Sequence, residues 1–72
     1  MNAPTAQNKV ISSLRTCNQI QYPATLRFAE MWRKILSDCL AEAKSKAEWY
    51  HLTGFINILD GEIATTNAKF EG

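Results

Sequence analysis

Glycine and proline are scarce in this 72-residue chain, which contains three glycines and two prolines. Folds built from many short strands need these residues at their turns, so their scarcity predicts a few long elements instead. Apolar residues make up 46% of the sequence, which is ordinary for a globular protein and argues against disorder. A chain of this length makes one domain at most, with a small core.

Cysteine and histidine are also scarce. Cys17 and Cys39 are the only cysteines, and His51 is the only histidine. Their positions match no recognised metal-ligand spacing, so the sequence predicts no metal site. The helical wheel places Cys39 inside an apolar face, where a thiol is inert filling, and His51 at a polar edge. We expect both cysteines to be buried apolar groups, and no thiol–imidazole pair to act in catalysis.

Motifs for other kinds of chemistry are missing as well. There is no glycine-rich phosphate loop, no Walker lysine and no dinucleotide fingerprint. Glu30, Asp38 and Glu42 lie on or near one charged helix face with lysines close by, which makes them a poor carboxylate pair for acid–base catalysis. The sequence therefore predicts that the chain is not an enzyme and uses no cofactor and no small-molecule substrate.

Long apolar runs are absent too. No stretch approaches the ~20 apolar residues of a transmembrane helix. The first ten residues lack the charged and apolar regions of a signal peptide. We expect no membrane association and a cytoplasmic location. Small helical chains without motifs are common among products of phages and mobile elements, and such an origin would place the chain in a virion.

What the sequence does contain is helical periodicity. Val10, Ile11, Leu14 and Cys17 predict a short first helix over about residues 6–19, after a flexible arm at 1–7. Pro23 interrupts this helix and suits the first turn of the next one.

The second pattern predicts a long amphipathic helix over about residues 24–45, because its apolar residues fill one half of the helical wheel. An arc this wide predicts packing against two neighbouring helices. The residues of this arc are Phe28, Ala29, Met31, Trp32, Ile35, Leu36, Cys39, Leu40, Ala43 and Ala47.

A third helical pattern covers about residues 46–63 and is followed by a loose tail at 64–72. Its apolar residues are Leu52, Phe55, Ile56, Leu59 and Ile63. Gly61 is expected to end the helix, although Gly54 and Gly61 also share one face where another helix could approach closely.

The third apolar stripe lies about 150° from the second if the helix is continuous. Either the chain turns near residues 44–48, or one long helix is shared between subunits. Ser45 and Glu48 read as a capping box, which favours the turn. The predicted fold is thus a small all-α three-helix domain dominated by a helical hairpin: a short first helix, a long second helix, and a third packed back on it.

Charge is uneven along a chain whose net charge is +1. Residues 1–47 carry seven basic and three acidic side chains, a net of +4, whereas residues 48–72 carry one basic and four acidic, a net of −3. The two parts can attract each other, within one chain or between chains, or both can be solvated faces.

The aromatic residues suggest the most specific function. Trp and Tyr are favoured as anchors in interfaces. We predict a protein–protein interaction module, a small regulator, inhibitor or accessory subunit of a larger protein or assembly, with partner-binding residues Trp32, Trp49, Tyr50 and Phe55. The competing interpretation is that Trp32 is core and that Trp49 and Tyr50 close the hairpin. The broad apolar arc also suggests a homodimer.

Nucleic-acid binding is the alternative function. It would use a basic face of the second helix, formed by Arg27, Arg33, Lys34 and Lys44. Glu30 and Asp38 interleave with these cations and the chain is nearly neutral, so nucleic acid is the weaker prediction.

Overall fold

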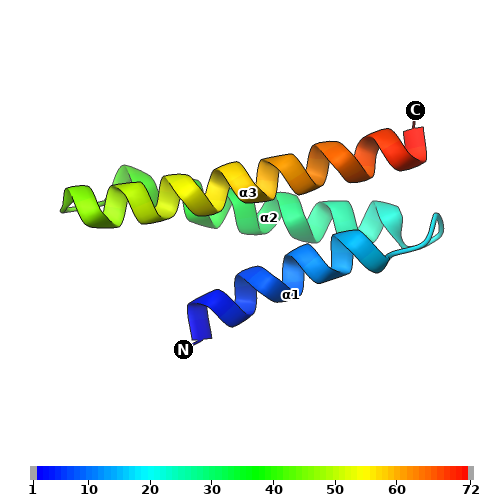
Figure 1. Cartoon of the computed structure of the whole chain (residues 1–72), viewed down its shortest axis with the longest axis horizontal. Coiled ribbons are helices and arrows are strands. Elements are labelled where there is room, and N and C mark those ends of the chain that lie inside the picture. The colour runs from blue at the N-terminus through cyan, green and yellow to red at the C-terminus, as the bar shows by residue number, and fades with distance from the viewer. Residues whose placement is uncertain (1, 72) are drawn as a thin grey trace.

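The computed structural model describes the backbone of residues 2–71 and the side chains of residues 7–71. This part of the chain forms three helices and no strand: α1 (Asn2–Thr16), α2 (Tyr22–Ala41) and α3 (Lys46–Glu71). Helices α2 and α3 run antiparallel as a hairpin, and α1 packs along one side of it and diverges toward its N-terminus (Figure 1). The predicted all-α three-helix fold is confirmed.

The chain turns between α2 and α3. Helix α2 ends at Ala41, and the next helix begins four residues after Glu42, at Lys46. The Ser45 hydroxyl accepts a hydrogen bond from the Glu48 N–H at 3.1 Å, and the Glu48 carboxylate accepts one from the Lys44 N–H at 3.1 Å. The capping box thus forms, with its carboxylate one residue further back than in the usual pattern. The turn is confirmed, and the continuous helix was wrong.

Helices α1 and α2 begin earlier than their apolar patterns indicate. The arm predicted to be flexible at 1–7 is helical from Asn2, while Met1 lies outside the described residues. Pro4 falls in the first turn of α1, where a missing N–H breaks no helical hydrogen bond. Helix α2 starts at Tyr22, with Pro23 in its first turn as predicted.

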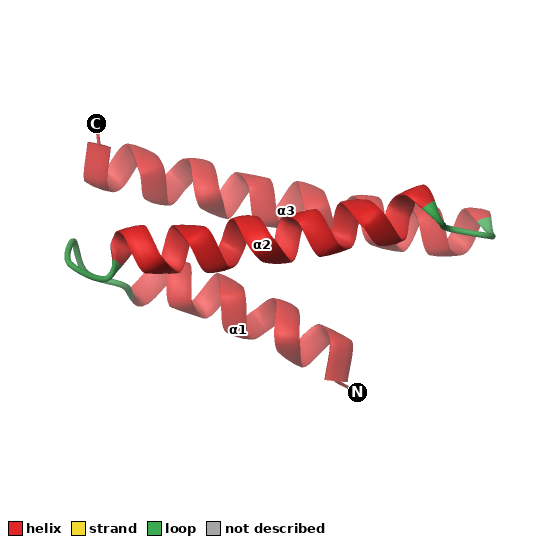
Figure 2. Cartoon of the chain, turned by 180° about the vertical axis from the view of Figure 1, so that it is seen from behind, coloured by secondary structure: helices red, strands yellow, loops and turns green. Residues whose placement is uncertain are grey.

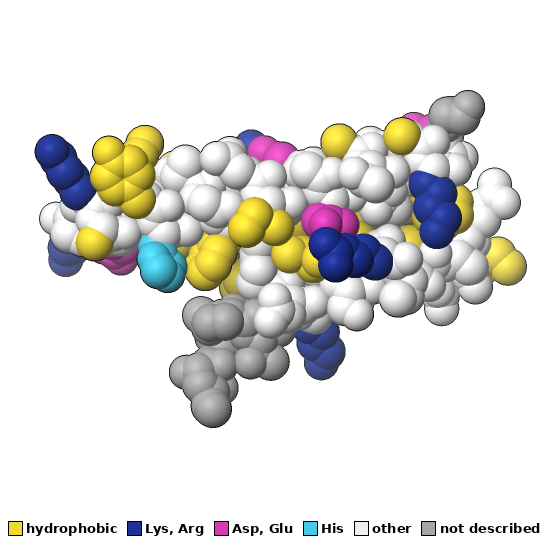
Figure 3. Space-filling view, in the orientation of Figure 1, with side chains coloured by type: hydrophobic (Ala, Val, Ile, Leu, Met, Phe, Trp, Pro, Cys, Tyr) yellow, Lys and Arg dark blue, Asp and Glu magenta, His cyan; other side chains and the backbone are white. Residues whose placement is uncertain are grey.

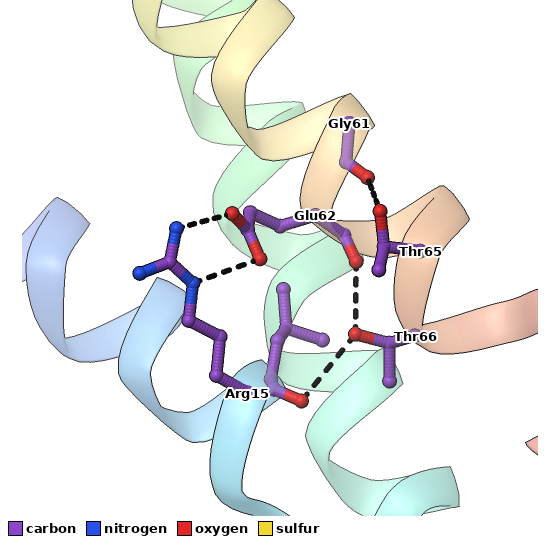
Figure 4. Close-up of polar contacts among 6 residues, drawn as sticks. Arg15, Gly61, Glu62, Thr65 and Thr66 are labelled. Atoms are coloured by element: carbon purple, nitrogen blue, oxygen red, sulfur yellow. Dashed lines mark hydrogen bonds and ion pairs between the residues drawn. The ribbon is translucent and has the colours of Figure 1, made fainter. Parts of the chain in front are cut away.

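Helix α3 continues to Glu71, so the prediction of a loose tail at 64–72 was wrong for the described residues, which exclude Gly72. Gly61 lies inside the helix and does not end it. Tertiary contacts hold this segment. The buried Thr66 hydroxyl lies 3.3 Å from the Leu14 carbonyl of α1 and 2.8 Å from the Glu62 carbonyl (Figure 4). The Phe70 ring lies 5.0 Å from that of Tyr22.

The core lies where the three helices meet. Its buried members come in pairs from α1, α2 and α3: Val10 and Leu14, Ala29 and Leu36, and Ile56 and Leu59. The side chains packed around them are Trp32, Leu40, Leu52, Phe55 and Ile63. The first and third apolar patterns therefore face the core as predicted.

One buried amide connects all three helices. The Trp32 indole N–H donates to Gln7 Oε1 at 2.9 Å, and Gln7 Nε2 donates to the Phe55 carbonyl at 3.1 Å. Gln7 is only 4% exposed, so its two polar atoms need these protein partners. The contact fixes α1 across both arms of the hairpin.

Two ion pairs join the basic front of the chain to its acidic end. Arg15 forms a two-point contact with Glu62 at 2.6 and 3.2 Å (Figure 4), and Arg33 forms one with Asp60 at the same distances. The Arg15 guanidinium lowers the pKa of the Glu62 carboxyl below its ordinary value of 4.5. Figure 3 shows a basic and an acidic side chain lying side by side near the centre of the molecule. Of the two alternatives that the uneven charge left open, the structure shows attraction within one chain.

Candidate protein-binding surface

Helix α2 has two apolar faces, and only one of them is buried. The inner face contains Ala29 and Leu36, which are buried against α1 and α3. The outer face exposes Phe28, Met31 and Ile35 by 47%, 61% and 45%. We call the exposed row the outer stripe and define it as Ala24, Phe28, Met31, Ile35 and Cys39, all classed as exposed.

The outer stripe follows from the helical repeat. Its members are spaced by three or four residues, so they point in nearly one direction, about 120° around the helix from the inner face. The wide apolar arc predicted for this helix therefore consists of two faces. Helices α1 and α3 cover the inner face and leave the outer stripe exposed. The predicted packing of α2 against two neighbouring helices is confirmed, but these helices cover only one of its two apolar faces. The expectation of a buried Cys39 thiol was wrong, whereas Cys17 is buried as predicted.

The shape of the molecule explains why this face stays open. The chain measures 40 × 24 × 14 Å, so it is flat. Seen from behind, α2 lies in front of both α1 and α3, and no other helix lies over it (Figure 2). A face of α2 that turns away from its neighbours can be covered only from outside the chain.

The N-terminal end of the outer stripe is hollowed. The hollow has a volume of about 510 Å³ and is open to solvent, and its lining is mainly apolar. It is lined by Pro23, Ala24, Arg27, Phe28 and Met31. A concave apolar surface with a cationic rim can receive an apolar side chain whose neighbour is acidic.

Charges differ between the two ends of the outer stripe. Arg27 lies beside its N-terminal half, whereas Asp38 and Glu42 follow along its C-terminal half. Lys34 is 3.5 Å from Asp38 in an exposed pair one turn apart. The stripe thus runs from a cationic end to an anionic end.

The tip of the hairpin is a second exposed surface. Trp49 and Tyr50 lie in the first turn of α3, 46% and 66% exposed, with their rings edge to face at 5.2 Å. The hairpin extends past α1 at this end, where hydrophobic side chains reach the surface (Figure 3). Both predicted partner-binding residues at the tip are therefore accessible from solvent.

The other two predicted partner-binding residues have structural roles. Trp32 is half-buried, and Gln7 accepts the hydrogen of its indole. Phe55 is half-buried, packs against the core, and meets the exposed His51 ring edge to face at 5.4 Å. The packing agrees with the interpretation of Trp32 as core, while Trp49 and Tyr50 lie at the end of the hairpin and are exposed.

The predicted basic face is not continuous. Arg33 turns toward α3 and pairs with Asp60, and Lys34 pairs with Asp38. Lys44 lies in the turn beyond α2, and its backbone N–H caps α3 through Glu48. Among the four predicted cations, Arg27 alone borders the hollow.

Two further properties of the described residues bear on other functions. The described side chains, those of residues 7–71, include no cluster of three or more histidine, cysteine, aspartate or glutamate residues able to hold a metal ion. None of the described helices is long and apolar enough to cross a lipid bilayer.

Comparison with known proteins gives no relative. The chain matches no protein-family model, no curated protein and no solved structure.

Proposed function

We propose that this chain is a protein–protein interaction module without chemistry of its own, and that it binds another protein chain through the outer stripe of α2. The observation that carries the proposal is the exposure of three large apolar side chains on one helix face, next to a core that is complete without them. Contiguous exposed apolar surface of this kind marks interaction sites in small proteins.

The size of the stripe limits how the partner binds. Fully burying a side chain such as Phe, Met or Ile contributes ~1.5–3 kcal/mol, and Phe28, Met31 and Ile35 are already about half buried. Covering the three would therefore contribute on the order of 2–4 kcal/mol, less than the ~4–15 kcal/mol that association itself costs. A partner has to add apolar surface of its own and fill the hollow.

The hairpin tip supports the role of a regulator or accessory subunit. Trp49 and Tyr50 offer an aromatic anchor at the end of the molecule, well separated in sequence from the outer stripe. A chain with two such surfaces can join a larger protein or assembly at one while the other is occupied.

Nucleic-acid binding has less support. Two of its four predicted cations, Arg33 and Lys34, already contact carboxylates of the same chain. Phosphates would have to compete with those carboxylates.

Site-specific photocross-linking tests the proposal. A photoreactive amino acid would replace Met31 in the outer stripe, and Ser37, exposed on the opposite side of α2, would serve as the matched control. In cells that naturally make the chain, we expect a protein adduct from position 31 that is absent from position 37 and disappears with Ile35→Glu. Equal or absent adducts from the two positions would contradict the proposal.

A further inference from the structure

We infer that the partner on the outer stripe is a second copy of this chain, with the two α2 helices packed antiparallel about a two-fold axis beside Met31. This inference rests on the proposed function and identifies the protein chain that binds the outer stripe. Three features of the stripe carry it: its arrangement of sizes, its arrangement of charges and its open position.

The sizes along the stripe are close to a palindrome. Small Ala24 and Cys39 stand at its two ends, large Phe28 and Ile35 come next, and Met31 lies in the middle. When two such helices meet antiparallel, Phe28 of one copy faces Ile35 of the other. The hollow beside Phe28 and Met31 then receives the Ile35 side chain of the second copy.

The charges along the stripe are complementary only in this orientation. Arg27 and Asp38 border the same edge of the stripe at its opposite ends. An antiparallel two-fold pair brings equal edges together, so Arg27 of one copy comes within about 3 Å, measured along the helix axis, of Asp38 of the other. A parallel two-fold pair brings opposite edges together, so Arg27 of one copy and Asp38 of the other would lie on different sides of the contact and could not pair.

The fold leaves room for this arrangement. Helix α2 is the helix in front when the molecule is seen from behind, so a second helix can approach it without meeting α3 (Figure 2). A matching stripe on the partner doubles the apolar surface that binding covers. The hairpin tips, with Trp49 and Tyr50, then lie at opposite ends of the dimer and remain exposed.

Disulfide trapping tests both the partner and the orientation. The parent is the full chain with Cys39→Ser, in which the remaining Cys17 is buried. Single variants Met31→Cys and Ile35→Cys, with Ser37→Cys as the exposed control, would be oxidised mildly and their covalent dimers measured. A mixture of Phe28→Cys and Ile35→Cys tests the facing pair. Circular dichroism confirms that each variant is helical.

We expect Met31→Cys to form covalent dimers about tenfold faster than Ser37→Cys, because position 31 of one copy lies next to position 31 of the other at the two-fold axis. The mixed Phe28→Cys and Ile35→Cys pair should cross-link faster than either variant alone. Two Ile35→Cys residues would lie about 10 Å apart along the axis, beyond the ~7 Å that a disulfide spans.

Equal rates for Met31→Cys and Ser37→Cys would overturn the inference, and so would efficient cross-linking of Ile35→Cys to itself. These results are independent of the photocross-linking experiment above. If that experiment gives an adduct of a different protein while Met31→Cys shows no preference, the interaction module stands and the second copy is ruled out. If neither experiment singles out position 31, both proposals fail.

Discussion

The inner and outer faces of α2 are both apolar and differ in what covers them. Leu36 belongs to the inner face and is 4% exposed, whereas its neighbour Ile35 belongs to the outer face and is 45% exposed. Their side chains are chemically alike, so hydrophobicity alone does not distinguish a surface that folding buries from one that it leaves exposed. The difference comes from the position of the other two helices, which only the three-dimensional arrangement supplies.

Truncating Leu36 and Ile35 to alanine, one at a time, tests the difference between the two faces most strongly. Leu36→Ala leaves a cavity among the three helices and should lower the free energy of unfolding by about 2–5 kcal/mol. That loss is a large part of the stability of so small a domain. Ile35→Ala should change it by less than about 0.5 kcal/mol at protein concentrations too low for association. Urea unfolding followed by circular dichroism measures both, and equal losses would show that the two faces do not differ.

The polar link through Gln7 should give the next largest effect. Gln7→Ala leaves the Trp32 indole N–H and the Phe55 carbonyl without their partner, which should cost about 1–3 kcal/mol. Asn8→Ala, at the exposed neighbouring position, is the control. Urea unfolding gives the magnitude, and tryptophan fluorescence should shift for Gln7→Ala alone. An unchanged unfolding curve would mean that this amide does not hold α1 to the hairpin.

Substitutions at the two glycines of α3 are expected to raise stability, in contrast to the two destabilising substitutions above. A Cβ atom added at Gly54 or Gly61 would meet nothing within 4 Å, so neither glycine serves a close approach within the chain. Alanine should therefore raise stability by up to ~1 kcal/mol at each site, because it favours the helix. Thermal unfolding should show a higher melting temperature for each variant, and the two increases should add in the double variant. A decrease at either site would indicate a contact on that face.

The smallest expected effect is the pH dependence from Glu62. Its folded pKa lies below 4.5, so the folded chain binds this proton more weakly than the unfolded chain does. The contribution to stability is fully present above pH 4.5 and is lost as the pH falls through the lower folded pKa. Unfolding between pH 6 and pH 3, roughly the range in which carboxyls titrate, should lose less stability for Glu62→Gln than for the wild type. Parallel curves would contradict a role for the Arg15 pair.

The sequence predicts the fold because local signals agree with the tertiary structure. Leu14, Leu36 and Leu59 lie on apolar faces of the right period and are buried. Ser45 and Glu48 mark the turn correctly, since capping depends on residues close in sequence. The end of α3 could not be predicted in this way, because Thr66 is held by Leu14, which lies far away in the sequence.

The candidate site could be predicted only in part. Trp49 and Tyr50 are exposed, as partner-binding residues have to be, because they lie outside the buried apolar faces of both α2 and α3. The outer stripe was hidden inside the wide apolar arc of α2, and its width alone does not say which half is covered. The charges that border the arc were the usable signal: Arg27 and Asp38 border the side that the other two helices leave uncovered.

The most direct test of the two-face account is the mass in solution, measured by light scattering after size exclusion over a wide concentration range. We expect the wild type to rise from 8.1 kDa toward twice that mass, and Met31→Glu to remain at 8.1 kDa with its helicity unchanged. A wild type that stays at 8.1 kDa, or a Met31→Glu variant that dimerises as well as the wild type, would contradict the account of an outer face that binds a second copy.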